Sequence, residues 1–208
     1  MAVTSKTDIC NLSQDLLSGA TVQDIDTPLS ALESLLARWY DQCRRKVLRE
    51  HPWHFATKRL IIAASSTDPE FGYTAAFPVP NDFIRLLTVE NSDGEEISPN
   101  NYQFEGNSIL ISTDSASVYL RYIYDIEDVS QFDPMFISYL TLDIALSTAY
   151  KVTESNGNID RISQLLKQQG AMARAISGQE RRPTRIQRST NRSVRLNASS
   201  TISHRIIF

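Results

Sequence analysis

Apolar side chains at helical spacing open the chain and predict a first helix over 5–18. Its stripe consists of Ile9, Leu12, Leu16 and Leu17. A second helix is predicted over 28–51, because Thr27 is a good N-cap residue and Pro28 fits a first turn. It should end before Pro52, since the residue before a proline is driven out of the α region. Its apolar stripe consists of Leu32, Leu35, Leu36, Trp39, Cys43 and Val47.

Residues 53–125 change to short apolar runs separated by turn residues, a pattern typical of antiparallel strands. Trp53 and Phe55 alternate as strand residues would, and the Asp93-Gly94 dipeptide is favoured in tight hairpins. Near the end of this region, one side of a strand would carry Val118, Leu120, Tyr122 and Tyr124. Six or seven strands are expected. They should form an antiparallel sheet or small sandwich, because no helices alternate with the strands.

Helical patterns then return over 134–153 and 159–177. Asp133 and Pro134 suit the cap and first turn of the third helix. From there to Tyr150 the one charged residue is Asp143, so this helix should be buried on most sides. A buried carboxylate needs a partner, most simply an arginine or backbone donors. The predicted fold is therefore α+β: a four-helix bundle with an inserted antiparallel β layer over 53–125, together making one domain over 1–180.

The charge of the chain is unevenly distributed. The net charge is −3, yet residues 181–208 hold seven arginines and no acid, which leaves 14 basic and 24 acidic residues in 1–180. The arginines are Arg181, Arg182, Arg185, Arg188, Arg192, Arg195 and Arg205, and the apolar residues Ile206, Ile207 and Phe208 follow them. This composition predicts an extended arm without a core of its own.

The arm has two interpretations, a solvated tail or a segment that binds a partner. Arginine favours planar, bidentate contacts to carboxylates or phosphates, and this favours a binding arm. Its composition does not separate a protein partner from nucleic acid.

Overall composition is that of a globular protein, with 41% apolar and 22% charged residues. No run of 18 apolar residues occurs, and the N-terminal stretch lacks a signal-peptide core. We therefore expect a protein that has no membrane partner and stays in the cytoplasm where it is made. Cys10 and Cys43 lack metal-type spacing and are expected to be buried and reduced.

Motifs for catalysis are missing from the sequence. It contains no phosphate-binding loop, dinucleotide fingerprint, zinc-protease helix or nucleophile elbow, and it has only three histidines. Asp125, Glu127 and Asp128 follow a predicted strand and could in principle hold a glycosidase-like pair. Acidic loop residues are more often solvated surface. We expect no enzyme activity, no cofactor and no metal.

The stretch Trp53-His54-Phe55 follows the break at Pro52 and has three possible roles: a ligand site, a metal site or a structural wedge. A ligand or metal site would require further polar groups, and none is evident nearby in the sequence. We expect a wedge that fixes the first strand against the helices. The predicted core residues are Trp39, Trp53, Phe55, Phe83, Phe136 and Tyr139.

The order of these elements resembles the tail tubular protein A family of bacteriophage head–tail adaptors. In that family a long helix runs into a W-x-F-A element and then a stretch with spaced Tyr, Ala, Pro, Asp and Arg. The matching residues here are Trp53, Phe55, Ala56, Tyr73, Ala75, Pro80, Asp82, Phe83 and Arg85. The family's acidic loop and buried helix are matched by Asp133, Phe136, Tyr139 and Ala145. The resemblance covers about residues 8–178, so the arm is outside it.

The resemblance implies a structural protein of the virion, located at the head–tail interface. Such adaptors form a dodecameric ring between the portal and the tail nozzle or tube. DNA passes through the ring without sequence-specific binding, and acidic side chains in the lumen would let it slide. The alternative is a DNA-binding accessory module that acts through the arm, and a muralytic enzyme ranks third.

Overall fold

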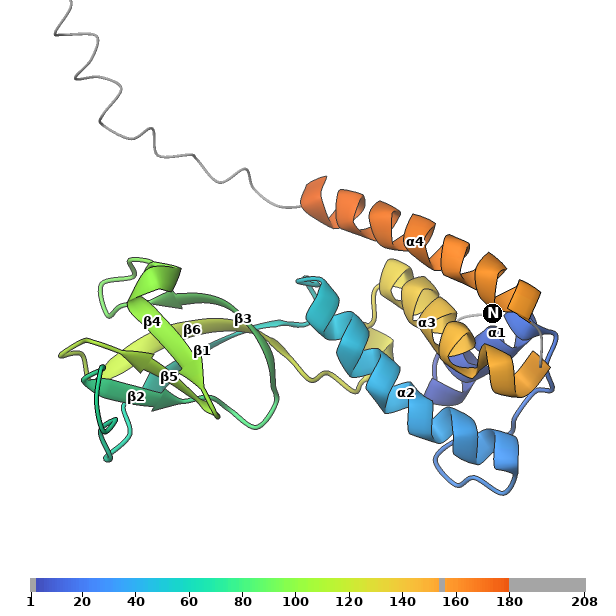
Figure 1. The fold of residues 1–208 in the computed structure, drawn as a ribbon, viewed down its shortest axis with the longest axis horizontal. Helices are drawn as coiled ribbons and strands as arrows, with labels where there is room; N and C mark the ends of the chain where they lie inside the picture. Colours follow the sequence, from blue (N-terminus) through green and yellow to red (C-terminus); the bar gives the residue numbers. More distant parts are fainter. Residues whose placement is uncertain (1–2, 154–155, 180–208) are drawn as a thin grey trace, which may run out of the picture.

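The computed structural model describes residues 3–153 and 156–179, and within them the chain is a mixed α+β protein. Figure 1 shows two lobes side by side along the long axis, one of helices and one of strands. The described part contains four α-helices and two small antiparallel sheets, which confirms the predicted α+β class. The predicted arm, 181–208, lies outside the described residues.

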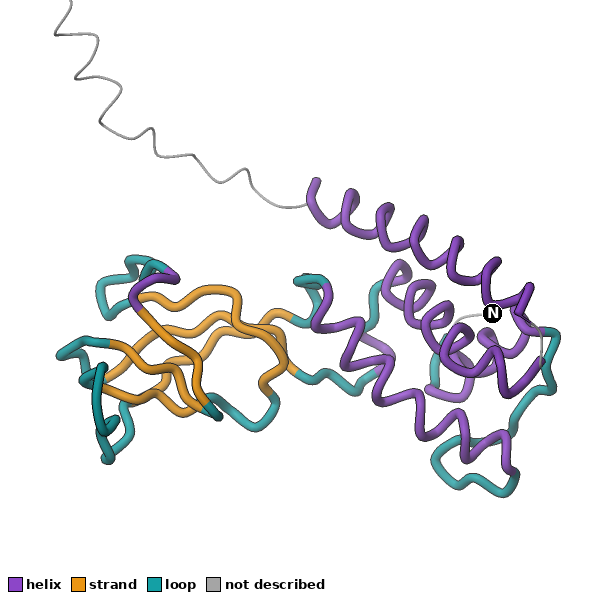
Figure 2. The backbone as a smooth tube through the Cα atoms, in the orientation of Figure 1, coloured by secondary structure: helices purple, strands orange, loops and turns teal. Residues whose placement is uncertain are grey.

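The helical lobe is built around α3, which spans Pro134–Thr153. This helix packs against α1 (Lys6–Leu17), α2 (Ala31–Glu50) and α4 (Asn156–Gln179). The other helices lie on several sides of α3 (Figure 2), and its buried residues include Leu140, Leu142 and Ile144, as its near-absence of charge indicates.

Helix α2 begins three residues later than the sequence pattern indicates. Ser30 caps it: its hydroxyl accepts a hydrogen bond from Glu33 N at 3.1 Å, and the Glu33 carboxylate accepts one from Ser30 N at 2.8 Å. The expected start at Pro28 was wrong because Thr27 is engaged elsewhere, donating its hydroxyl hydrogen bond to Asp24 at 2.6 Å. A reciprocal capping box satisfies two backbone N–H donors at the start of the helix. It is therefore favoured over a cap by a single hydroxyl.

The β lobe consists of two three-stranded sheets. One has the order β1-β6-β3 and the other β2-β5-β4, and all pairs are antiparallel. The strands are β1 Thr57–Ala63, β2 Ala75–Pro78, β3 Phe83–Glu90, β4 Tyr102–Glu105, β5 Ser108–Ile111 and β6 Ser117–Tyr124. Between the sheets, a shared core includes Phe77, Ile109, Val118, Leu120 and Tyr122. The lobe is thus a small sandwich, one of the two arrangements expected.

The expected turn at Asp93-Gly94 is present. Gly94 adopts a φ of 80°, a left-handed conformation that suits glycine, and the Glu90–Glu96 bridge closes the loop.

The chain between α2 and β1 is a turn, so the expectation that Trp53 and Phe55 lie on a strand was wrong. Ala56 N donates to Trp53 O at 3.2 Å and Thr57 N donates to His54 O at 3.2 Å, and β1 starts only after these bonds. As residues i and i+2, the two rings would share one face of a strand as well, so their alternation does not distinguish a strand from this turn. In the turn both rings contact Phe136.

Candidate functional site

The two lobes meet at one junction, formed by the C-terminal half of α2, the turn over 51–56, the start of β3 and the connection from β6 to α3 (Figure 1). This junction brings together segments that are up to about 90 residues apart, since the Tyr139 hydroxyl donates to Glu50 Oε2 at 2.7 Å. We treat it as the candidate functional site because it sets how the β lobe is held relative to the helices.

An aromatic cluster fills the centre of the junction. Trp53 is only 4% exposed, and its Nε1 donates to Val47 O at 2.9 Å. Its ring meets Phe136 edge to face at 5.2 Å between centroids, and Phe136 in turn contacts Phe55 at 5.0 Å and Phe132 at 4.8 Å. Edge-to-face pairs add to the stability that burial alone provides.

Arg44 of α2 forms the charged half of the junction. Its side chain is 2% exposed, its Nη1 donates to Asp125 Oδ1 at 2.6 Å and also to the carbonyl of Ile126, and Glu127 lies 3.7 Å away. Arg45 Nε lies 3.3 Å from the second oxygen of Asp125. Such a buried cation must keep its partners, because removing them would leave an uncompensated charge.

The same contacts bear on whether two of the acids after β6 could form a glycosidase-like catalytic pair. Asp125 and Glu127 are held by Arg44, and the Asp128 carboxylate accepts hydrogen bonds from Ser130 N at 3.0 Å and from the side chain of Gln131 at 2.8 Å. Each of the three carboxylates therefore has a structural partner. Their arrangement gives no support to a glycosidase-like site.

Two side chains near the start of β3 complete the junction. Arg85 Nη1 donates to the carbonyl of Arg49 at 3.0 Å and more weakly to that of Glu50 at 3.3 Å, which satisfies the C-terminal end of α2. Asp82 accepts hydrogen bonds from Lys58 Nζ at 2.8 Å and from the Tyr122 hydroxyl at 2.9 Å. Burial opposes ionisation of Asp82, but its hydrogen bonds from Lys58 and Tyr122 outweigh this and lower its pKa.

Most residues that carry the family resemblance converge on this junction, although they are scattered along the sequence. Those at the junction are Trp53, Phe55, Ala56, Asp82, Arg85, Asp133, Phe136 and Tyr139. The others lie elsewhere: Tyr73 contacts Gln103 across the second sheet, Ala75 is in β2, Pro80 lies in the loop before β3, Phe83 stacks on Tyr122 in the inter-sheet core, and Ala145 is buried in α3. The structure thus brings eight of these thirteen residues to the junction.

The predicted core residues differ in burial. Phe136 is fully buried and Trp53 nearly so, while Trp39, Phe55, Phe83 and Tyr139 are partly buried. In α2 the fully buried aromatic residue is Tyr40 rather than Trp39. The predicted arm residues Arg181 to Arg205 and Ile206, Ile207 and Phe208 lie outside the described residues.

Sequence reasoning missed Arg44, the most important charge in the junction. A signal was present, because Tyr40, Arg44 and Val47 recur at helical spacing on the buried face of α2. An arginine at such a position indicates a buried ion pair, which here forms with the acids that follow the last strand, β6.

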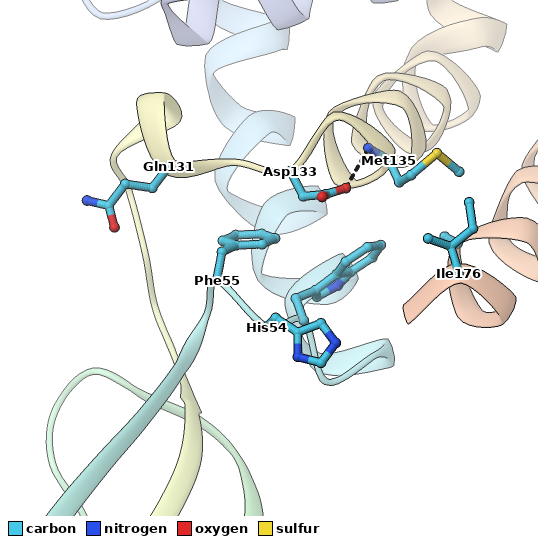
Figure 3. A pocket seen from close by; sticks show the side chains of 8 residues that line it. His54, Phe55, Gln131, Asp133, Met135 and Ile176 are labelled. Atoms are coloured by element: carbon cyan, nitrogen blue, oxygen red, sulfur yellow. Dashed lines mark hydrogen bonds between the residues drawn. The ribbon is translucent and has the colours of Figure 1, made fainter. Parts of the chain in front are cut away.

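A small hollow opens beside the junction, with a volume of about 190 Å³. Figure 3 shows the labelled side chains that line it: His54, Phe55, Gln131, Asp133, Met135 and Ile176. Asp133 already accepts a hydrogen bond from Met135 N at 2.7 Å. The hollow is smaller than the usual range for pockets that bind drug-sized ligands.

The rest of the described chain offers no site for metal or redox chemistry. Among residues 3–153 and 156–179 no three His, Cys, Asp or Glu side chains are grouped to hold a metal ion. Cys10 and Cys43 are both free and buried, and burial raises the pKa of each thiol to about 12. Within the same residues, no helix combines the length and apolar character that crossing a bilayer requires.

No protein-family model and no curated protein matches this chain.

Proposed function

We propose that this chain is a structural head-to-tail adaptor of a bacteriophage virion. In this role it forms a ring that joins the portal to the tail and lines the channel through which DNA leaves the head. The supporting observation is the junction, where residues that characterise the adaptor pattern meet although the sequence separates Trp53 from Tyr139 by more than 80 positions.

A subunit of a closed ring requires a fixed angle between its two lobes. Each subunit must present its lobes to its neighbours at one angle, because small angular errors accumulate around a closed ring. Arg44 and Trp53 restrict this angle from two sides, one through ion pairs and the other through packing. In this proposal the four helices act as one bundle around α3, and the β layer projects from it toward neighbouring proteins.

The partners follow from the same proposal. They are further copies of the chain in a dodecameric ring, the portal protein on one side, and a tail nozzle or tail tube protein on the other. The protein would be made in the host cytoplasm and end in the virion, acting without a cofactor and without enzymatic turnover.

The arm is assigned to portal or neighbour binding. Its seven arginines would pair with carboxylates on that partner, while Ile206, Ile207 and Phe208 would provide an apolar contact at its end. Arginine suits this role because its planar fork binds a carboxylate through two hydrogen bonds.

The proposal is tested by mixing the full chain with its cognate portal ring and sedimenting the ring. We expect the chain to co-sediment and to saturate at one copy for each portal subunit. Arg44→Ala, which frees the joint, should weaken the interaction, whereas Arg38→Ala, at an exposed position of the same helix, should serve as a matched control. A full-length, folded chain that stays in the supernatant at all concentrations would contradict the proposal.

The alternative function, DNA binding through the arm, is favoured by one observation, the seven arginines without an acid in 181–208. Binding of that kind weakens steeply as salt rises, because each phosphate contact releases counterions. Tight, salt-sensitive binding to duplex DNA without portal binding would favour this alternative.

A further inference from the structure

The outer face of the β1-β6-β3 sheet carries a hollow of about 520 Å³, away from the other sheet. Ile62, Val118 and Leu120 point into the core between the sheets, so their neighbours along the strands point outward. The outward side chains in the hollow are those of Arg59, Ile61, Glu90, Tyr119 and Arg121. Ile61 is 64% exposed, which is unusual for an isoleucine in the middle of a strand.

Two arginines in this hollow lack an anionic partner. Arg59 and Arg121 are directly opposite each other in the β1–β6 pairing, and like charges in such positions repel. The Nε atom of Arg121 is buried and makes no hydrogen bond within the described part of the chain. Neither guanidinium forms an ion pair with a carboxylate of residues 3–153 or 156–179, although Glu90 lies at the rim. The hollow therefore favours an acidic ligand with an apolar group.

A segment of this same chain has that chemistry. The loop over 64–74 leaves the end of β1 and crosses to β2 in the other sheet (Figure 1). It exposes Asp68 and Glu70 and contains no lysine or arginine. Phe71, the next residue, is 87% exposed. Aromatic residues are enriched in protein–protein interfaces relative to the rest of the surface, so Phe71 is a candidate contact residue.

We propose that the loop of one copy docks into the hollow of the next copy. Phe71 would pack on Ile61 and Tyr119, while Asp68 and Glu70 would pair with Arg59 and Arg121. Because the two surfaces differ, the contact is head to tail, and a contact of this kind forms a ring when the rotation from one copy to the next closes. The inference rests on the ring assembly of the proposed function and names its lateral interface.

Other occupants fit less well. The chain's own arm is rich in arginine and would be repelled by Arg59 and Arg121. A nucleic-acid backbone would satisfy the arginines but would leave the exposed side chain of Ile61 without an apolar partner. The loop satisfies both parts of the surface.

Disulfide trapping tests the contact with the full-length protein. Ile61→Cys in one preparation is mixed with Phe71→Cys in another under mild oxidation, and Leu29→Cys replaces Phe71→Cys in the control mixture. Leu29 is 98% exposed and lies in the helical lobe. The native Cys10 and Cys43 are buried in every variant. Docking raises the effective concentration of the two thiols, so the Ile61–Phe71 mixture should form mixed dimers at least about tenfold faster than the control.

Charge reversal shows whether the trapped contact is the proposed one. R59E/R121E in the Ile61→Cys chain should lower the rate to that of the control, and D68R/E70R in the Phe71→Cys chain should restore it. Equal rates for the Ile61–Phe71 and control mixtures would overturn the inference, as would a fast rate that R59E/R121E leaves unchanged. If R59E/R121E instead abolishes binding of a short oligonucleotide while the trapping rates equal the control, the surface binds nucleic acid. These assays contain no portal, so the proposed function and this contact can fail separately.

Discussion

Trp53 is the residue on which the junction depends most for packing. Replacing it with alanine removes a side chain that is 4% exposed and contacts Phe136. We expect Trp53→Ala to lower the free energy of unfolding by about 3–5 kcal/mol, measured by urea titration. Trp53→Phe, which keeps an aromatic ring in the same place, should cost clearly less. A Trp53→Ala variant as stable as the parent that binds the portal poorly would make Trp53 a contact residue.

Asp143 is the buried charge in α3, and its partner is a lysine rather than the arginine or backbone donors expected. Lys46 Nζ lies 2.5 Å from Asp143 Oδ1, and the second carboxylate oxygen is buried without a hydrogen bond within the described residues. Lys46 is half-exposed, so it can turn to water if the carboxylate is lost. Asp143→Leu should therefore be tolerated.

Asp143→Lys should not be tolerated, because it places a second cation beside Lys46. We expect it to lower the free energy of unfolding by about 3–5 kcal/mol, clearly more than Asp143→Leu does. Thermal or urea unfolding of the two variants side by side gives this difference. Equal stabilities would mean that the position is accessible to water.

For single residues, the sequence predicts which side chains are buried better than it predicts which residues those side chains contact. The burial of the third helix and the isolation of Asp143 were both readable from the near-absence of charge over 134–150. The partner of Asp143 comes from α2, 97 positions earlier, and local pattern carries no information on such pairs. Arg44 was missed for the same reason, because an arginine within a helix is usually solvated and only its distant acids show otherwise.

Among the secondary-structure elements, the start of α2 is the most sensitive to pH. Backbone N–H groups of Leu29, Gln23 and Ser30 donate to the Glu33 carboxylate and lower its pKa to about 2. A carboxyl group whose pKa is lower in the folded chain stabilises it above the unfolded pKa, and this contribution disappears as the pH falls to the folded pKa. The contribution of Glu33 should thus be lost between about pH 4.5 and pH 2.

Glu33→Gln tests this dependence. It should be less stable than the parent at neutral pH, and the difference should shrink as the pH falls through this range, measured by urea unfolding at several pH values. Glu70→Gln, in an exposed loop, is the control and should follow the parent throughout. A difference between Glu33→Gln and the parent that stays constant down to pH 2.5 would contradict the role of the ionised carboxylate.

Strand and helix types were largely predictable, whereas boundaries were not. β6 follows its apolar alternation closely, because one face lies in the inter-sheet core, whereas the pairing of β3 shifts register between Phe83 and Arg85 and again between Leu86 and Thr88. The region from Trp53 to Ala56 has the same alternation and is a turn, which hydrogen bonds from Ala56 N and Thr57 N close while both rings contact Phe136. Tertiary contacts override local preference at such positions.

For the whole molecule, the arm should matter for assembly and not for the fold. Residues 181–208 carry too few apolar side chains to extend the core. A chain that ends at Glu180 should therefore keep its melting temperature within a few degrees and lose stable binding to the portal. Two further variants separate the contribution of the charges from that of the apolar end. One replaces the seven arginines with glutamine, and the other removes residues 206–208. A truncated chain that binds with full affinity would assign the arm no role there.

The most direct measurement is electron microscopy of cognate portal rings mixed with the full-length protein. The proposed function predicts an additional layer on one end of every saturated ring, with the rotational symmetry of the portal and an open channel along the axis. The β lobes should project from this layer. Portal rings that stay bare while the protein remains folded and monomeric beside them would contradict the assignment as a head-to-tail adaptor.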